Sequence, residues 1–409
     1  MTSSYSTDIL IIGGGIAGLW LLNRLHSEGY QAILLENNCL GHGQTIASQG
    51  IIHGGLKYAL SGSLTTAANA IAAMPARWQD CLAGKGDVDL TGCQVLSNDY
   101  YMWSQASYRS RLKTFLGSKS LRGRIDAVDS TQSPAFFVQT EKKGSLYRLT
   151  DFVINTSSLL STLSRRHRDK IFKIDSRNLS LSQDDTGTLC TIKPPANNSH
   201  GVDATKADTL SIRAGKTVLC AGQGNQQLLE LAGISSPTMQ TRPLKMVYVK
   251  KASLPSVYVH CIGDGFSLTP KLTLTTHQCQ DGEAVWYLGG ELAEGGVNRS
   301  DAQQIVAAQA LLHDLFPWVD LSDAQWQCHA INRAEPKLSN QFRPDDAYFS
   351  NNKNILVTWP TKLTLAPSLA DMLVKDFKDS GFIGCQHSNA IDLANKLGPV
   401  EIASPIWNS

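Results

Sequence analysis

The first 36 residues hold the feature that most restricts how this chain can fold. An apolar run over residues 8–12 leads into a glycine turn, Gly13-Gly14-Gly15-Ile16-Ala17-Gly18. A helix-like stretch follows, and then a second apolar run that ends at Glu36. Strand, glycine turn, helix, strand and acid in this order are typical of a βαβ unit that binds a dinucleotide. A lone glycine turn would be weak evidence, but here all the flanking elements fall in register.

Each part of this unit has a predicted task. We expect Gly13 to let the chain turn sharply off the strand and Gly15 to let a pyrophosphate approach the backbone. Gly18 would let the helix pack close to the strand. The start of the helix, at Ile16 and Ala17, would present free N–H groups and the positive end of the helix dipole to the phosphates.

The chain that follows the second strand is predicted to run along the bound dinucleotide. Glu36 closes that strand 18 residues after the last glycine of the turn, where its carboxylate can accept hydrogen bonds from ribose hydroxyls, and Asn37 follows it. Residues 40–58 are rich in glycine and small polar side chains, so they could lie close to an extended ligand. Thr45 and Ser48 carry hydroxyls that can donate to phosphate.

Residues 43–58, GQTIASQGIIHGGLKY, resemble the FAD-dependent D-amino-acid oxidase and glycine oxidase superfamily. Within it they are most similar to FAD-linked glycerol-3-phosphate dehydrogenases and L-2-hydroxyglutarate dehydrogenases or oxidases. Segments 149–155, 217–224 and 361–364 are similar, in order, to the family's middle helix start, buried strand with glycine turn, and C-terminal flavin segment. The resemblance implies FAD as the cofactor and adds to its expected contacts Gln44, Gly50, Ile51, Ala221, Gly222, Lys362, Leu363 and Thr364.

At Pro360-Thr361 the sequence departs from the family, which usually has a glycine pair before Lys-Leu-Thr. Proline has no N–H to donate. We therefore expect a backbone donor to the flavin ring to be missing or replaced. A second departure is Asn37-Asn38, where relatives often carry a basic residue.

A chain of 409 residues suits two interleaved domains better than one core. The expected fold class is α/β, or α+β overall, with a Rossmann-like FAD-binding domain interleaved with an antiparallel β-sheet substrate domain. The FAD-binding domain would comprise 1–81, 148–243 and 326–409, and the substrate or cap domain 82–147 and 244–325. Helices are predicted over 64–81, 152–165 and 302–315 and from near Pro367, a β-meander over 173–219 with a loop tip at 194–201, and antiparallel strands at 246–249, 272–276 and 285–288. The aromatic cluster at 100–103 is expected in the core or in a substrate pocket.

Composition excludes several classes of partner. The net charge is only +2, so no nucleic acid is expected. No apolar run reaches the ~18 residues of a membrane span, although peripheral membrane contact stays open. The N-terminus lacks the basic region of a signal peptide. The nine cysteines form no CxxC pair and no zinc spacing, so we expect no metal, reduced thiols and a cytoplasmic location.

His53, Arg333 and Lys362 are the predicted catalytic residues. The resemblance places His53 beside the isoalloxazine, where an imidazole could take a hydroxyl or amine proton; the alternative is a structural histidine. Second-rank candidates are Lys57 and Tyr58.

The other two candidates are cations. Arg333 falls where the family places a substrate-binding arginine, and a guanidinium can grip a carboxylate or phosphate with two hydrogen bonds. The alternative is a surface arginine paired with Glu335. Lys362, together with the N-terminus of the last helix, would stabilise negative charge on the reduced flavin; the alternative is a surface lysine.

The leading interpretation is an FAD-dependent dehydrogenase or oxidase. It would oxidise a small anionic hydroxy compound, a 2-hydroxy acid or a polyol phosphate, by hydride transfer to flavin N5 and pass electrons to oxygen or a quinone. One alternative is an amino-acid or amine oxidase of the same fold. Another is a non-catalytic flavin-bound binding protein, which only Pro360-Thr361 supports. An NAD-only dehydrogenase is a more distant option.

Overall fold

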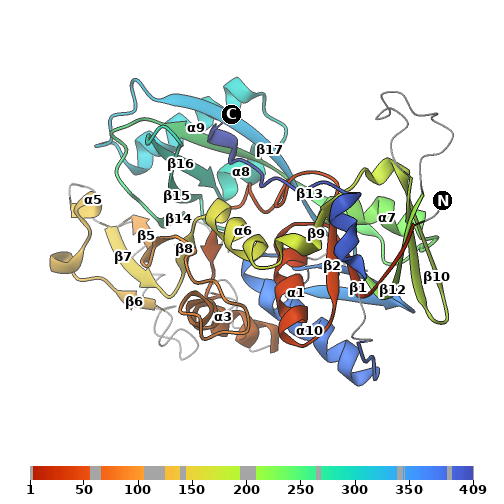
Figure 1. The fold of residues 1–409 in the computed structure, drawn as a ribbon. Helices are drawn as coiled ribbons and strands as arrows, with labels where there is room; N and C mark the ends of the chain where they lie inside the picture. Colours follow the sequence, from red (N-terminus) through yellow and green to blue (C-terminus); the bar gives the residue numbers. More distant parts are fainter. Residues whose placement is uncertain are drawn as a thin grey trace.

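The computed structural model describes residues 3–55, 66–105, 125–138, 144–193, 209–263, 269–338, 344, 346–384 and 389–408. They form an α/β fold with two eight-stranded sheets and one three-stranded sheet (Figure 1). Lys57, Tyr58 and the loop tip at 194–201 lie outside the described residues. No helix in the described ranges has the length and apolar character needed to cross a bilayer.

The first large sheet carries the glycine turn at its centre. Its order is β10-β11-β12-β1-β2-β9, and β19 and β18 extend it beside β12. β1 runs parallel to β2 and β12, while β9 is parallel to β2 and β19 to β12. β10 and β11 pair antiparallel with β12, which gives the expected meander. The strands are β1 (Ser3–Ile12), β2 (Ala32–Glu36), β9 (Ile171–Lys173), β10 (Leu179–Asp184), β11 (Gly187–Ile192), β12 (Leu210–Leu219), β18 (Tyr348–Asn352) and β19 (Ile355–Trp359).

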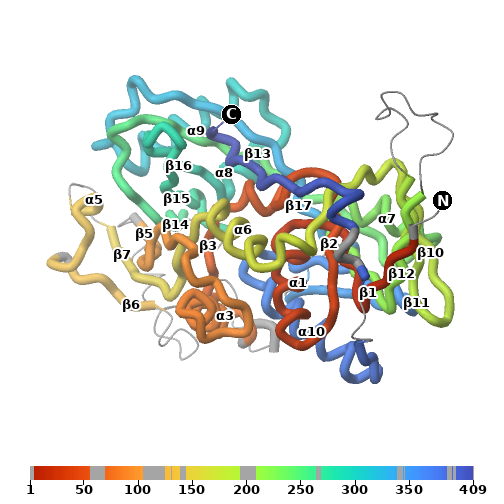
Figure 2. Tube along the Cα trace, viewed as in Figure 1, coloured from red at the N-terminus to blue at the C-terminus, as the bar shows by residue number. Residues whose placement is uncertain are grey.

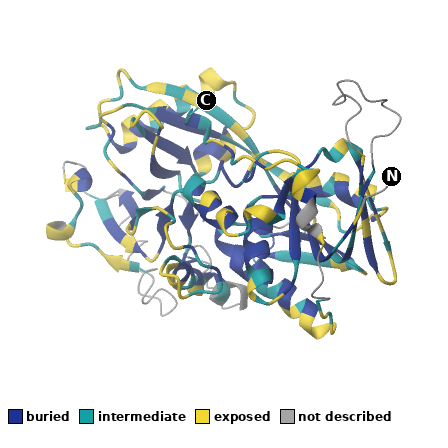
Figure 3. Ribbon diagram, in the orientation of Figure 1, coloured by how far each residue is buried: buried dark blue, intermediate teal, exposed yellow. Residues whose placement is uncertain are grey.

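Alternation along β1 separates two cores, because successive side chains point to opposite faces of a sheet. Ile9 and Ile11 join the core formed with helices α1 (Ile16–Ser27), α6 (Thr156–Arg165) and α10 (Ala366–Asp379). Leu10 and Ile12 join the core beneath the meander and α7 (Asn225–Leu231). Residues 9–12 of β1, at the centre of this sheet, are therefore buried on both faces (Figure 3).

The second large sheet is antiparallel except where β14 meets β5. Its order is β17-β13-β16-β15-β14-β5-β7-β6. Helix α9 (Asp301–Leu315) packs on one face. The strands are β5 (Tyr100–Gln105), β6 (Ile125–Ala127), β7 (Gly144–Leu149), β13 (Met239–Lys250), β14 (Val259–Ile262), β15 (Leu272–Gln278), β16 (Ala284–Gly289) and β17 (Gln325–Pro336). The short helices α5 (Ala135–Val138) and α8 (Glu291–Gly295) flank it.

The helix expected over 152–165 begins later than predicted. Residues Phe152–Ile154 form β8, which pairs with β3 (Ile51–Ile52) and β4 (Val95–Ser97) in the third sheet. All three residues of β8 are buried, so the segment meets neighbours on both faces, as a strand does and an amphipathic helix does not. Asn155 then caps α6 by accepting a hydrogen bond from Ser158 N at 3.0 Å.

The other predicted helices match the structure closely. α3 spans Thr66–Leu82, and α9 begins at Asp301. Pro367 lies in the first turn of α10, where its missing N–H costs no hydrogen bond. The aromatic cluster at 100–103 forms β5 and is mostly core, although Met102 also lines the cavity described below.

The expected domain limits fall inside strands of the antiparallel sheet. Residue 244 lies within β13 and 326 within β17, and these two strands pair along their full lengths. The C-terminal segment also crosses between the sheets (Figure 2). Ile402 bridges to Leu40, and Trp407 donates to Gln278 O in β15. The two-domain division at the predicted residues stays a prediction.

Candidate active site

A cavity of about 1210 Å³ lies between the glycine turn and the antiparallel sheet. Ligand pockets are commonly ~300–1,000 Å³, so this volume suits a large cofactor together with a small molecule. Of the predicted site residues, those that line it are Gly13, Gly15, Ile16, Ala17, Glu36, Asn37, Gln44, Thr45, Ser48, Gly50, Ile51, His53, Ala221, Gly222, Arg333, Lys362 and Leu363.

Gly18 and Thr364 do not line the cavity. Each instead contacts residues that do line it. A Cβ on Gly18 would lie 2.0 Å from Gly13 O, so only glycine lets α1 approach the turn this closely. Thr364 Oγ1 accepts from His53 N at 2.9 Å and donates to Ile51 O at 3.3 Å. Thr364 therefore fixes the backbone of the small-residue segment.

The glycine turn is shaped by close backbone contacts on one side and open space on the other. Gly13 has φ +115°, and a Cβ there would lie 2.6 Å from Ala221 N in the segment after β12. Gly15 has an ordinary φ of −77°. The nearest atom to a Cβ on Gly15 would be Thr45 Oγ1 at 3.3 Å, so Gly15 leaves room on the cavity side.

The polar groups around the turn fit a dinucleotide. Glu36 Oε2 accepts from Gly14 N at 2.5 Å, which holds the carboxylate at the cavity wall. Thr45 Oγ1 accepts from Ile16 N at 3.1 Å. Ser48 Oγ is buried and has no hydrogen-bond partner among the described residues. A buried hydroxyl normally has a hydrogen-bond partner. A ligand in this cavity would supply one for Ser48 Oγ.

The Pro360-Thr361 departure keeps a backbone shape that glycine usually supplies. Thr361 has φ +60°, a conformation rare for a β-branched residue. Lys362 N donates to Pro360 O at 2.7 Å across it, closing a γ-turn at the cavity wall. Such strain costs about 1–3 kcal/mol and is concentrated at functional sites.

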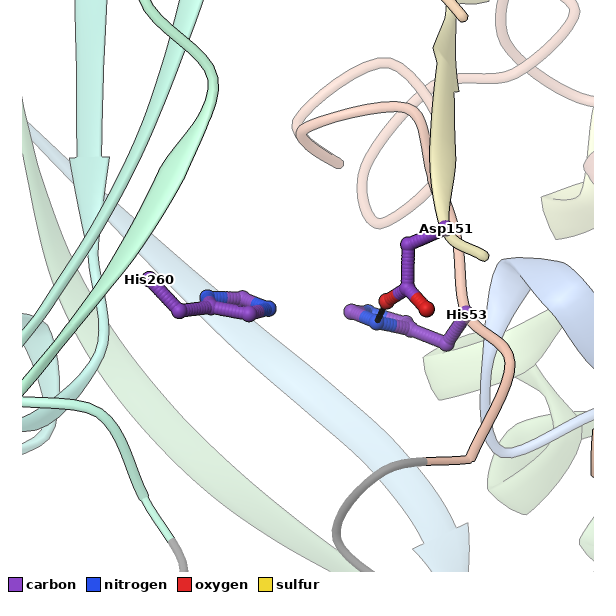
Figure 4. A group of neighbouring side chains, drawn as sticks. All are labelled: His53, Asp151 and His260. Carbon is purple, nitrogen blue, oxygen red and sulfur yellow. Dashed lines mark hydrogen bonds and ion pairs between the residues drawn. The ribbon is translucent and has the colours of Figure 1, made fainter. Parts of the chain in front are cut away.

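His53, just after β3, and Asp151, just before β8, form a hydrogen-bonded pair at the cavity wall (Figure 4). His53 Nδ1 lies 3.0 Å from Asp151 Oδ2, and Asp151 Oδ1 accepts from Gly54 N at 2.8 Å. Burial raises the pKa of Asp151, but the bonds from His53 and Gly54 outweigh it and hold this pKa below its ordinary value. Because the carboxylate is ionised and acceptor-only, His53 Nδ1 carries the hydrogen of this bond.

His260 on β14 faces this pair from the antiparallel sheet (Figure 4). The two imidazole rings are 5.9 Å apart at their centres and nearly parallel, at 10°. Burial lowers the pKa of His260 to about 3, so its ring is neutral. In the described residues, His53, Asp151 and His260 also form one group whose potential metal-ligand atoms lie within 4.8 Å of one another.

Arg333 lies on β17, partly buried at the cavity wall. Its Nη2 is 3.6 Å from Glu294 Oε1, and its Nε donates to Arg242 O at 3.4 Å. Burial lowers the pKa of Arg333, and the nearby Glu294 and Glu335 oppose that shift. Glu335 is itself buried and lies 2.5 Å from Arg242 Nε. Arg333 therefore differs from the surface arginine of the alternative interpretation.

Sequence reasoning missed Asp151 and His260. Asp151 was inside a segment similar to the family, but its pairing with His53 joins residues 98 positions apart. His260 lies in a buried strand whose pattern, Val-His-Cys-Ile, carries no catalytic signal. One clue was available for Asp151, since an acid directly before a fully apolar run is unusual unless it is paired.

Comparison with known proteins agrees with this arrangement. Residues 8–356 match the family described as FAD dependent oxidoreductase. The chain is 41% identical to a probable FAD-dependent oxidoreductase of Pseudomonas aeruginosa over 408 residues, covering 100% of this chain and 99% of the relative.

Solved structures show the same fold. The crystal structure of the Pseudomonas aeruginosa protein superposes with a TM-score of 0.81, at 37% identity over 100% of this chain and 99% of that one. FAD-bound L-α-glycerophosphate oxidase from Mycoplasma pneumoniae gives 0.62 at 16% identity, covering 90% of this chain and 94% of that chain. Glycine oxidase from Geobacillus kaustophilus gives 0.60 at 15%, covering 93% and 95%. The chain is therefore an enzyme of the FAD-dependent oxidoreductase family that includes D-amino-acid oxidases, with FAD as its cofactor.

Proposed function

We propose that this enzyme oxidises a small anionic hydroxy compound, a 2-hydroxy acid or a polyol phosphate, at the carbon that bears the hydroxyl. The observation that carries the proposal is the His53–Asp151 pair in the cavity wall, with Nδ1 bonded to the carboxylate at 3.0 Å. With Nδ1 bonded to the carboxylate, Nε2 is the ring nitrogen that would accept a proton from the substrate.

His53 acts as the general base. As the substrate carbon is oxidised, the hydroxyl loses its proton to His53 Nε2, and Asp151 stabilises the imidazolium that results. Thr364 and Gly54 hold the two partners in place through the backbone bonds at 2.9 and 2.8 Å. FAD, when bound, would supply the oxidant as the acceptor of a hydride from this carbon.

Arg333 anchors the anionic end of the substrate. Its guanidinium lines the same cavity as His53, and its partner Glu294 is half exposed and 3.6 Å away. This loose pairing leaves donors that a carboxylate or phosphate can engage. The glycine turn, Glu36, Thr45 and Ser48 would hold the adenosine and pyrophosphate of FAD.

Lys362, on the strained turn, would place positive charge near the flavin. Electrons would then pass to oxygen or a quinone. A cytoplasmic location, with peripheral membrane contact still open, is part of the same proposal.

The experiment compares the wild-type holoenzyme with His53→Gln in anaerobic flavin bleaching by sn-glycerol 3-phosphate, L-lactate and L-2-hydroxyglutarate. A general base contributes roughly 10²–10⁴-fold, so His53→Gln should slow bleaching by at least ~100-fold while FAD content stays unchanged. Wild-type bleaching by none of the three compounds, or equal rates in the variant, would contradict the proposal.

A further inference from the structure

We infer that His260 is a specificity-determining residue, whose Nε2–H donates to the substrate oxygen opposite His53 and so selects a hydroxyl over an ammonium group. The inference rests on the proposed function for its base, His53. It adds His260 as a second side chain that hydrogen-bonds to the substrate oxygen.

The proposed tautomer of His260 follows from the two hydroxyl groups beside its Nδ1. Nδ1 lies 3.0 Å from Thr273 Oγ1 and 3.4 Å from the Tyr100 hydroxyl. Tyr100 is fully buried, and burial raises its pKa well above the ordinary value, so the phenol keeps its proton. In the proposed arrangement His260 Nδ1 accepts that proton across the 3.4 Å contact. A neutral ring that accepts at Nδ1 must carry its hydrogen at Nε2.

The other edge of the ring faces the cavity. His260 lines the cavity and is 8% exposed, and its ring points across the gap toward His53 and Asp151 (Figure 4). One nitrogen of each histidine and an oxygen of Asp151 lie within 4.8 Å of one another. The two imidazoles therefore lie close together at the cavity, and in the proposed tautomers His53 offers an acceptor and His260 a donor, each at Nε2.

A donor and an acceptor on one space recognise a hydroxyl. A hydroxyl oxygen can donate its hydrogen to His53 Nε2 and at the same time accept from His260 Nε2–H. An ammonium group has hydrogens but no lone pair, so it would leave the His260 donor facing another donor. A buried donor without a partner is costly, and sites built to bond a polar group reject analogues that lack it. The pair thus favours a hydroxy acid over the amino acid with the same carbon skeleton.

A metal ion at the same three side chains is the competing interpretation. It is disfavoured because both Asp151 oxygens already accept hydrogen bonds, one from His53 Nδ1 and one from Gly54 N. A stoichiometric metal in the purified holoenzyme, with activity lost on EDTA treatment and restored by that metal, would overturn the inference.

The test uses two replacements of His260 in the holoenzyme. His260→Phe keeps a flat ring without the donor, and His260→Gln places an amide N–H near the position of Nε2. Anaerobic flavin reduction is measured with L-lactate against L-alanine and L-2-hydroxyglutarate against L-glutamate. His260→Phe should lower the hydroxy-to-amino rate ratio by roughly 10-fold, the value of one neutral hydrogen bond. His260→Gln should restore part of it, with FAD content equal in all three proteins.

Equal loss toward hydroxy and amino partners in His260→Phe would reduce His260 to a structural residue and leave the proposed function intact. Wild-type enzyme reduced only by the amino partners would overturn both. An independent measurement needs no substrate: ¹⁵N NMR of histidine-labelled holoenzyme should show His260 neutral with its hydrogen on Nε2. A His260 signal that shows the hydrogen on Nδ1 would contradict the inference.

Discussion

The first large sheet, which carries the glycine turn, and the second, antiparallel sheet line the same cavity in different ways. The first large sheet contributes mostly backbone: the turn at Gly13 to Gly15, with the segment from Glu36 to Gly50 beside it. The antiparallel sheet contributes side chains, among them His260 and Arg333, from strands far apart in sequence. Backbone binding needs glycines and small residues at fixed spacing, whereas side-chain chemistry needs only that tertiary structure bring the right groups together.

The largest expected effect is the loss of FAD binding when a single glycine of the turn is replaced. Gly15→Val should abolish FAD binding, because the Cβ itself meets only Thr45 Oγ1 at 3.3 Å while the added methyls would occupy cofactor space. The apoprotein should still fold.

Gly18→Ala should instead prevent folding, since its Cβ would lie 2.0 Å from Gly13 O. Gly398→Val, which points into open space, is the control. Flavin absorbance and circular dichroism separate the two losses, and a fully flavinylated Gly15→Val would refute the role given to the turn.

Asp151→Asn should leave the backbone scaffold intact and remove the base. The amide keeps an oxygen for Gly54 N but offers N–H to His53 Nδ1, which forces the ring hydrogen onto Nε2. Flavin reduction should slow by roughly 100-fold or more, with normal FAD content. Asp89→Asn, at a surface pair with Arg166, serves as the matched control. Wild-type rates in Asp151→Asn would show that His53 does not act as the base.

Arg333→Ala tests the substrate anchor of the antiparallel sheet. Charged hydrogen bonds contribute about 1.5–3 kcal/mol each, so the apparent substrate constant should rise roughly 10-fold or more. Arg333→Lys should recover only part of the loss, because a point charge cannot make the planar two-bond contact. The exposed Arg177 gives the control, Arg177→Ala. Steady-state kinetics decide the matter, and loss of FAD instead would move Arg333 to the cofactor.

One further prediction concerns stability in acid and leaves the kinetics unchanged. Burial lowers the pKa of both His260 and His277 to about 3. Each stays neutral in the fold but protonates in the unfolded chain below about 6.5, so stability is lost as the pH falls from 6.5 toward 3. At pH 5 the loss is about 2 kcal/mol for each, from 1.36 kcal/mol per pKa unit. His277 packs against Trp407 and is not among the residues that line the cavity. His277→Gln should therefore reduce the change in unfolding free energy between pH 7 and pH 5 by about 2 kcal/mol without altering kinetics; an unchanged difference would contradict burial as the cause.

The same contrast explains which parts of the molecule the sequence could reveal. The turn from Gly13 to Gly18 and the acid at Glu36 follow from local spacing, and the structure has the strand, helix and strand that this spacing predicts. The start of α6 was misplaced because Phe152–Ile154 is apolar throughout, and short apolar runs suit a helix and a strand equally.

The chemistry of the site was less accessible to sequence reasoning. His53 could be found through its neighbours in the small-residue segment. Its partners could not, because Asp151 and His260 reach it through contacts spanning about 100 and 200 residues. Nor could spacing show that Thr361 adopts the backbone conformation of a glycine. These features depend on how the two sheets are placed against each other.

The most direct test of the central claim is anaerobic stopped-flow reduction of the wild-type holoenzyme by matched pairs, L-lactate with L-alanine and L-2-hydroxyglutarate with L-glutamate, together with sn-glycerol 3-phosphate. The measured quantity is the rate of flavin bleaching at saturating substrate. The account predicts that a hydroxy compound bleaches the flavin and that its amino counterpart is at least ~10-fold slower, since only a hydroxyl satisfies both His53 and His260. Rapid bleaching by the amino acids, with none by the hydroxy compounds, would contradict it.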